Sequence, residues 1–149
     1  MKALVVYDSL YGNTAEIAKA IGSGITGEVK VLAVGEVQPS DLEALDLLIV
    51  GAPTQAGRPS QPMQAFLKEL PNTVVEGVNV AAFDTRLSTR WVKIFGYAAG
   101  KIGKNLKKKG GNLLLDPEPF FVKGKEGPMK DGELERAAQW ARQVVDSKG

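Results

Sequence analysis

Residues 5–14, VVYDSLYGNT, take the chain from an apolar run directly into a short polar loop. The apolar run starts at residue 3, and unbroken apolar character is typical of a central strand buried on both faces of a parallel sheet. After the loop, Ile17, Ala18 and Ile21 recur at the spacing of one helix face, and glycines follow them. We therefore expect a strand over residues 3–7 and a helix over residues 14–24.

The same alternation of apolar run and helical pattern continues along the chain, which is typical of β-α units around a parallel sheet. We expect further strands over residues 28–34, 47–51 and 78–83, and a fifth over 113–115 and 120–122 that prolines interrupt. We expect further helices over residues 40–45 (from a capping-box pattern at Ser40), from 60–62 to before Pro71, over 91–109 and over 134–145. The chain is thus predicted to be one α/β domain over residues 1–149, with a doubly wound sheet.

Composition excludes several kinds of chemistry. The 149 residues include no cysteine and no histidine, which removes disulfide scaffolds, zinc ribbons, thiol nucleophiles and imidazole metal sites. We expect no catalytic side chain and no metal site, so that any chemistry comes from hydroxyls, carboxylates, backbone dipoles or a bound cofactor. No apolar run is long enough for a signal peptide or a membrane span, which predicts a cytoplasmic protein.

The first polar loop has the residues of a phosphate cradle. Ser9 and Thr14 offer hydroxyls, Asn13 an amide and Gly12 a close backbone approach, all at the start of a helix whose free N–H groups attract anions. The loop contains no lysine or arginine, so a phosphate there would be held by neutral donors. The alternative is a purely structural loop, with Asn13 or Thr14 as the helix cap and Ser9 in a turn.

Over residues 5–21 the pattern V-V-Y-x-S-x-x-G-x-T-x-x-x-A-x-x-I resembles the phosphate-loop signature of flavodoxins at every defined position. The resemblance implies a five-stranded parallel sheet of order 2-1-3-4-5, with helices on both faces, and FMN as the cofactor. It also implies that one loop holds the ribityl phosphate, with these residues: Ser9, Leu10, Tyr11, Gly12, Asn13 and Thr14.

Two further loops follow the third and fourth predicted strands, at the edge where such sheets bind ligands. The resemblance implies that they enclose the isoalloxazine ring, with these residues: Pro53, Thr54, Gln55, Ala56, Gly57, Arg58, Asp84, Thr85 and Arg86. It implies ring contacts for Thr54 and Gly57, whose peptide would turn to meet flavin N5. The alternative for residues 51–59 is a simple Pro/Gly connector.

These two loops contain no aromatic residue to stack on a flavin, unlike those of many flavodoxins. Trp91 either covers the ring or packs at the start of the helix that follows. Arg58 or Arg86 could lie against the ring instead, because a guanidinium stacks on aromatic faces.

Charge is unevenly distributed along the chain. Residues 1–85 carry five bases and ten acids, whereas residues 86–109 carry eight bases and no acid. The basic segment is either a solvated helix face or an electropositive rim beside the flavin. Such a rim would attract redox proteins with acidic surfaces, or a small anionic or quinone substrate. Nucleic acid is not expected as a partner, because the basic run lacks interleaved exposed aromatics and the other half of the chain is acidic.

The leading interpretation is an FMN-binding electron carrier that works between a reductase and an acceptor protein. The alternative is an FMN-dependent oxidoreductase on the same fold, either a quinone reductase or a protoporphyrinogen-oxidase-like enzyme. A flavin-free binding module that kept the fold is a third hypothesis.

Overall fold

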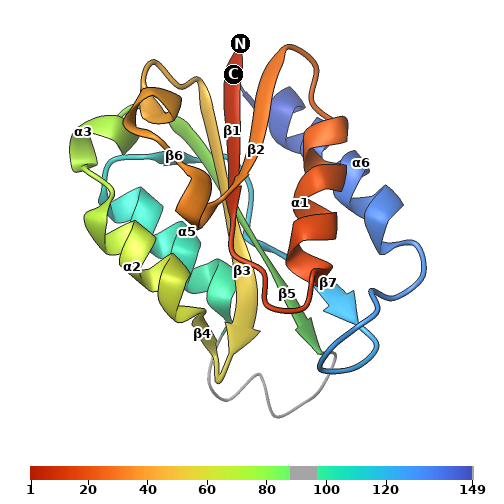
Figure 1. The fold of residues 1–149 in the computed structure, drawn as a ribbon. Helices are drawn as coiled ribbons and strands as arrows, with labels where there is room; N and C mark the ends of the chain where they lie inside the picture. Colours follow the sequence, from red (N-terminus) through yellow and green to blue (C-terminus); the bar gives the residue numbers. More distant parts are fainter. Residues whose placement is uncertain (88–96, 149) are drawn as a thin grey trace.

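A parallel sheet forms the centre of the computed structural model, which describes residues 1–87 and 97–148. Its strands lie in the order β2-β1-β3-β5-β6. The strand β7 also pairs with β5, further along toward the carboxyl end of β5 than β6 does. Their bounds are β1 Lys2–Tyr7, β2 Glu28–Ala33, β3 Leu47–Gln55, β5 Asn79–Leu87, β6 Asn112–Leu113 and β7 Glu118–Val122. The predicted order 2-1-3-4-5 is confirmed, with β5 as the fourth strand and β6 and β7 together as the fifth (Figure 1).

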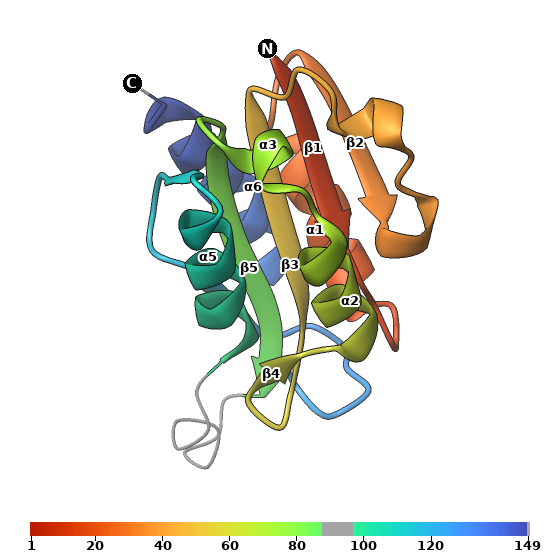
Figure 2. The ribbon, with the colours of Figure 1, turned by 90° about the vertical axis from the view of Figure 1, so that its left-hand side faces the viewer.

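Helices cover both faces of this sheet. On one face lie α1, Asn13–Ser23, and α6, Glu133–Asp146; on the other lie α2, Gln61–Glu69, and α5, Ala98–Lys108 (Figures 1 and 2). Side chains of β1, β3 and β5 alternate between the two apolar layers, so that Val5 packs toward α1 and α6 while Val6 packs toward α2 and α5. The expected doubly wound arrangement is therefore present.

The segment expected as a helix over residues 40–45 folds differently. Its first residues belong to a 3₁₀ turn, η2 over Pro39–Leu42, and another 3₁₀ turn, η1 over Val34–Glu36, precedes it. The Asp41 carboxylate accepts a hydrogen bond from the Gln38 N–H at 2.8 Å and an ion pair from Lys30. The Asp41 carboxylate therefore accepts the backbone N–H of the residue before Pro39, and the predicted cap at Ser40 is wrong.

Other elements also differ from expectation. The strands β3 and β5 each run four residues beyond the predicted ends at 51 and 83, so that several residues predicted in loops belong to strands. A short strand, β4 over Arg58–Pro59, and a short helix, α3 over Asn72–Val75, were not predicted. Of the helix expected over residues 91–109, α5 accounts for the later part, and residues 91–96 lie outside the described residues.

Candidate functional site

A cavity of about 570 Å³ opens at the carboxyl edge of the sheet, within the range of about 300–1,000 Å³ common for small-molecule sites. Eleven of the predicted site residues line it: Leu10, Tyr11, Asn13, Thr14, Pro53, Thr54, Gln55, Ala56, Gly57, Thr85 and Arg86. Its surface is mostly apolar with a few polar groups, as small-molecule sites usually are. The structure thus brings together the first loop, the β3–β4 hairpin and the end of β5, which are far apart in the sequence.

The first loop directs backbone donors at one point. Ser9 Oγ accepts hydrogen bonds from the Gly12 N–H at 3.1 Å and from the Ala15 N–H at 3.2 Å. Gly12 precedes the helix at a φ of 91°, a conformation that suits glycine, and having no side chain it leaves Ser9 Oγ to accept the Ala15 N–H of the first turn. Neither Asn13 nor Thr14 is the cap. The donors that Ser9 now satisfies are the kind that bind phosphate oxygens at helix starts.

A buried hydroxyl pair joins the first loop to the end of β5. Thr14 Oγ1 lies 2.8 Å from Thr85 Oγ1, and both side chains line the cavity although each is almost fully buried. The pair holds the start of α1 at a set distance from the end of β5.

The second loop is a tight hairpin and not an irregular connector. Residues Gln55 and Arg58 pair across a two-residue turn in which Ala56 and Gly57 have φ values of 50° and 77°. Two positive values in succession are those of a type I′ turn, the turn that matches the twist of a hairpin. Ala56 and Gly57 line the cavity, whereas Arg58 is exposed and lines a neighbouring hollow.

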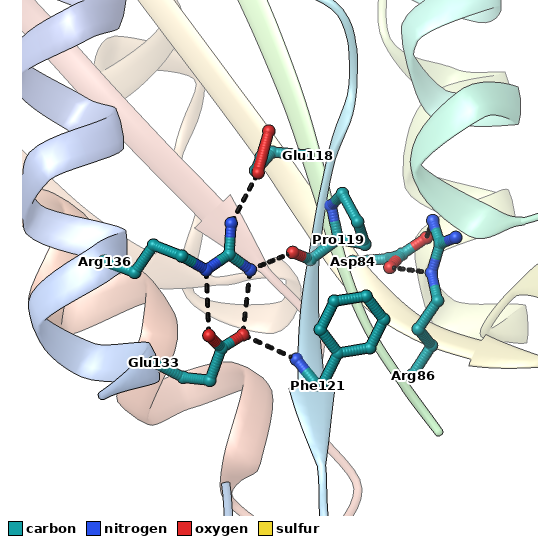
Figure 3. Close-up of polar contacts among 7 residues, drawn as sticks. All are labelled: Asp84, Arg86, Glu118, Pro119, Phe121, Glu133 and Arg136. Atoms are coloured by element: carbon teal, nitrogen blue, oxygen red, sulfur yellow. Dashed lines mark hydrogen bonds and ion pairs between the residues drawn. The ribbon is translucent and has the colours of Figure 1, made fainter. Parts of the chain in front are cut away.

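Asp84 lies behind the cavity wall and does not line it. Its fully buried carboxylate accepts hydrogen bonds from Arg86 Nε at 2.8 Å, Arg86 Nη2 at 2.7 Å and the Ala99 N–H at 2.9 Å (Figure 3 draws the pair with Arg86). The Thr54 hydroxyl donates to the same carboxylate and accepts from the Ala98 N–H. Asp84 therefore connects the end of β3 and the end of β5 to the start of α5.

Sequence reasoning missed an aromatic partner for Arg86. The guanidinium carbon lies 3.3 Å from the centre of the Tyr97 ring, a cation–π contact inside the protein. Arg86 is thus held by both Asp84 and Tyr97 where it borders the cavity. Trp91, the aromatic named from the sequence, lies outside the described residues.

Three lining residues were not predicted: Leu87 at the end of β5, Val122 at the end of β7 and Lys125 in the turn that follows. No pattern in the sequence connects residues 122–125 with the first loop, which is more than a hundred positions away. Only the pairing of β7 with β5 brings them to the same edge.

A partly buried ionic cluster holds β7 against α6. Glu133 accepts hydrogen bonds from the Phe121 N–H at 2.8 Å and from Arg136, which also binds Glu118 and the Pro119 carbonyl (Figure 3). Burial on its own raises the pKa of the Glu133 carboxyl, but the hydrogen bonds from Arg136 and Phe121 outweigh burial. The pKa of Glu133 therefore lies below its ordinary value of 4.5.

The Glu133 cluster predicts a specific loss of stability in acid. Because the folded-state pKa is lowered, the stabilisation is complete above the unfolded value near 4.5 and is lost as the pH falls through the lower folded value. We expect the difference in free energy of unfolding between wild type and Glu133→Gln to be largest at pH 7 and to shrink below pH 4.5. Denaturant titrations at a series of pH values measure it, with exposed Glu135→Gln as the control. A difference that stays constant with pH would contradict the assignment.

The basic side chains of α5 lie mainly away from the cavity. The helix starts beside Asp84 and spans eleven residues, which places its last turn about 15 Å further along. At that far end Lys109 donates to the Leu70 carbonyl at 2.8 Å (Figure 2 shows α5 along the sheet). Nearer the cavity, a second hollow of about 440 Å³ is lined by the bases Arg58, Lys68 and Lys101.

Within the described residues, no helix is long and apolar enough to cross a bilayer.

The chain is similar to several known flavodoxins. The family model described as Flavodoxin matches residues 5–140. A flavodoxin of Aquifex aeolicus (strain VF5) is 30% identical over 171 aligned positions, which cover 99% of this chain and 90% of that protein. The solved structure of a flavodoxin from the domain Archaea matches with a TM-score of 0.81 at 27% identity, over 99% of both chains. Oxidised flavodoxin 2 from Bacillus cereus matches in fold, with a TM-score of 0.80 at 21% identity over 98% of this chain and 99% of that one.

Proposed function

This chain belongs to the flavodoxin family, and we propose that the cavity at the carboxyl edge of its sheet is the FMN site. The protein is an FMN-binding electron-transfer protein. FMN supplies the redox chemistry when bound, while the chain binds it, orients it and limits its contact with water. The observation that carries the proposed site is the convergence of the Gly12 and Ala15 N–H groups beside a largely apolar cavity.

We assign the phosphate of FMN to the first loop. The backbone N–H groups that Ser9 Oγ now accepts from can bind phosphate oxygens, and the positive end of the α1 dipole favours the same charge. The Thr14 hydroxyl lies at the inner wall of this end, where it can donate to the phosphate.

The flavin ring is assigned to the space between the β3–β4 hairpin and the end of β5. The tight turn at Ala56 and Gly57 presents backbone groups to this space, and Leu87 adds an apolar wall. At the mouth, Leu10 and Tyr11 are 60% and 43% exposed, apolar surface that a bound ring would cover.

We propose a redox partner with an acidic docking surface. Arg58 follows the cavity residue Gly57 and lines the basic hollow with Lys68 and Lys101, so positive charge borders the proposed ring site. Complementary charge of this kind raises the rate of encounter and selects the orientation of the partner.

The experiment that tests the proposed function starts with purified protein and FMN. We expect stoichiometric binding, seen as quenching of flavin fluorescence, and reduction of the bound flavin by a separate reductase. Turnover of NAD(P)H with a quinone, without any added reductase, would instead identify an enzyme. A protein that does not bind FMN at all would refute both roles.

Replacing Thr14 with valine tests the phosphate end. We expect FMN binding to weaken by about 0.5–3 kcal/mol, the range from an ordinary hydrogen bond to a strong one with a charged group. Titration with FMN measures the change, and Thr14→Ser should retain most of the affinity because it keeps the hydroxyl. The control is Thr73→Val, at an exposed position in α3. Equal affinities of wild type and Thr14→Val would refute the contact.

A further inference from the structure

The chain that follows β7 forms a β-hairpin over residues 121–130, here called the C-terminal hairpin. The Lys130 N–H donates to the Phe121 carbonyl at 2.9 Å, and the Lys123 N–H donates to the Pro128 carbonyl at 2.8 Å. The Gly127 N–H donates to the Gly124 carbonyl at 3.0 Å and closes a four-residue turn at the tip. Lys125 is the second residue of this turn, so its backbone position is determined by the hairpin.

The base of the C-terminal hairpin is anchored in the core. Val122 and Met129 form a bridge across the hairpin and are both buried. The Phe121 N–H donates to the Glu133 carboxylate, which also accepts a hydrogen bond from Arg136 (Figure 3). The hairpin is therefore a supported part of the fold that can present a side chain at a defined place.

The tip of the hairpin lies against the first loop. A Cβ atom added to Gly127 would be 2.4 Å from Asn13 Oδ1, so the backbone of the hairpin tip lies close to the Asn13 side chain where α1 begins. Figure 1 shows the chain after β7 passing beside the start of α1. Lys125, two residues before this contact, lines the same cavity as Leu10 and Tyr11.

The charged side chains in the described part of the cavity lining are positive, and only one of the two is paired with a carboxylate. Among the described residues of the lining, Arg86 and Lys125 are the cations, and neither aspartate nor glutamate is present. Arg86 is neutralised by its paired hydrogen bonds to Asp84. Lys125 is exposed and makes no ion pair or hydrogen bond with any residue that the structure describes, and its neighbour Glu126 is not part of the lining.

We propose that Lys125 binds the phosphate of FMN and so makes the C-terminal hairpin a fourth segment of the cofactor site. The inference rests on the proposed function and adds a cation to a phosphate site whose own loop has only neutral donors. An ammonium group within reach of a phosphate forms a charge-assisted hydrogen bond and lowers the free energy of the bound dianion. The protein then discriminates FMN from riboflavin partly through a residue more than a hundred positions from the first loop.

The test compares the affinities of Lys125→Gln and wild type for FMN and for riboflavin, which lacks the phosphate. We expect FMN to bind about tenfold more weakly to the variant, the lower end for a hydrogen bond between charged groups, and riboflavin affinity to stay unchanged. Added salt should weaken FMN binding to wild type more than to the variant. Lys125→Arg should bind FMN nearly as wild type does, because it keeps the charge.

Lys123→Gln is the matched control, because Lys123 lies in the same hairpin, pairs with Asp131 and does not line the cavity. Unchanged FMN affinity of Lys125→Gln, in a protein that binds FMN normally, would overturn the role of Lys125 and leave the proposed function intact. Equal weakening of FMN and riboflavin would also overturn it, since the phosphate would not be the group recognised. Failure of wild type to bind FMN would overturn the proposed function itself.

Discussion

Asp84→Ala is expected to lower the free energy of unfolding by about 3–5 kcal/mol, the cost of removing one partner from a buried ion pair. The side chain of Asp84 is fully buried and that of Arg86 is 11% exposed, so water cannot replace the lost carboxylate. The substitution also removes the acceptor of the Ala99 N–H at the start of α5. Chemical denaturation with linear extrapolation measures the loss.

A double variant shows whether the unpaired charge causes the loss. Asp84→Ala combined with Arg86→Met removes both charges, and we expect it to be more stable than Asp84→Ala alone. Asp116→Ala, at an exposed carboxylate, should change the free energy of unfolding by no more than about 0.5 kcal/mol. A double variant that loses the sum of the two single losses would contradict the pairing argument.

Phe83→Ala is expected to lower the free energy of unfolding by about 3–5 kcal/mol, as large-to-small changes of buried aromatics do. Phe83 is fully buried in β5 and meets Phe120 and Trp140 edge-on, with ring centres 6.2 and 6.3 Å away. Its loss opens a cavity between the sheet and α6. Denaturant titration measures it, and Phe66→Ala, at a half-buried position in α2, should cost clearly less.

Gly51 provides a second test of the same packing. A Cβ atom added there would lie 2.2 Å from the Phe83 ring, so Gly51→Ala should cost about 1–3 kcal/mol by overpacking. In the Phe83→Ala background that clash is gone, and we expect Gly51→Ala to be nearly neutral. If Gly51→Ala costs the same in both backgrounds, Phe83 is not what occupies the space above Gly51.

Local patterns predicted the parts of the fold whose contacts are local. Ser9 Oγ reaches Gly12 and Ala15, three and six positions away, so the spacing of the first loop already contains its geometry. The alternation of apolar runs and helical patterns predicted the main strands and helices because each depends on its own periodicity. The capping prediction at Ser40 failed because a neighbouring side chain, Asp41, competes for the same turn.

The sequence by itself determined the kind of fold, the local geometry of the first loop and the resemblance that names FMN, since each depends on residue types at short, regular spacings. Only the tertiary structure decided that Asp84 is buried behind the cavity, that Tyr97 supports Arg86 and that Lys125 lines the same cavity as the first loop. These arrangements depend on how the carboxyl ends of β1, β3, β5 and β7 converge. That convergence results from packing two helical layers on one sheet, and no short stretch of sequence encodes it.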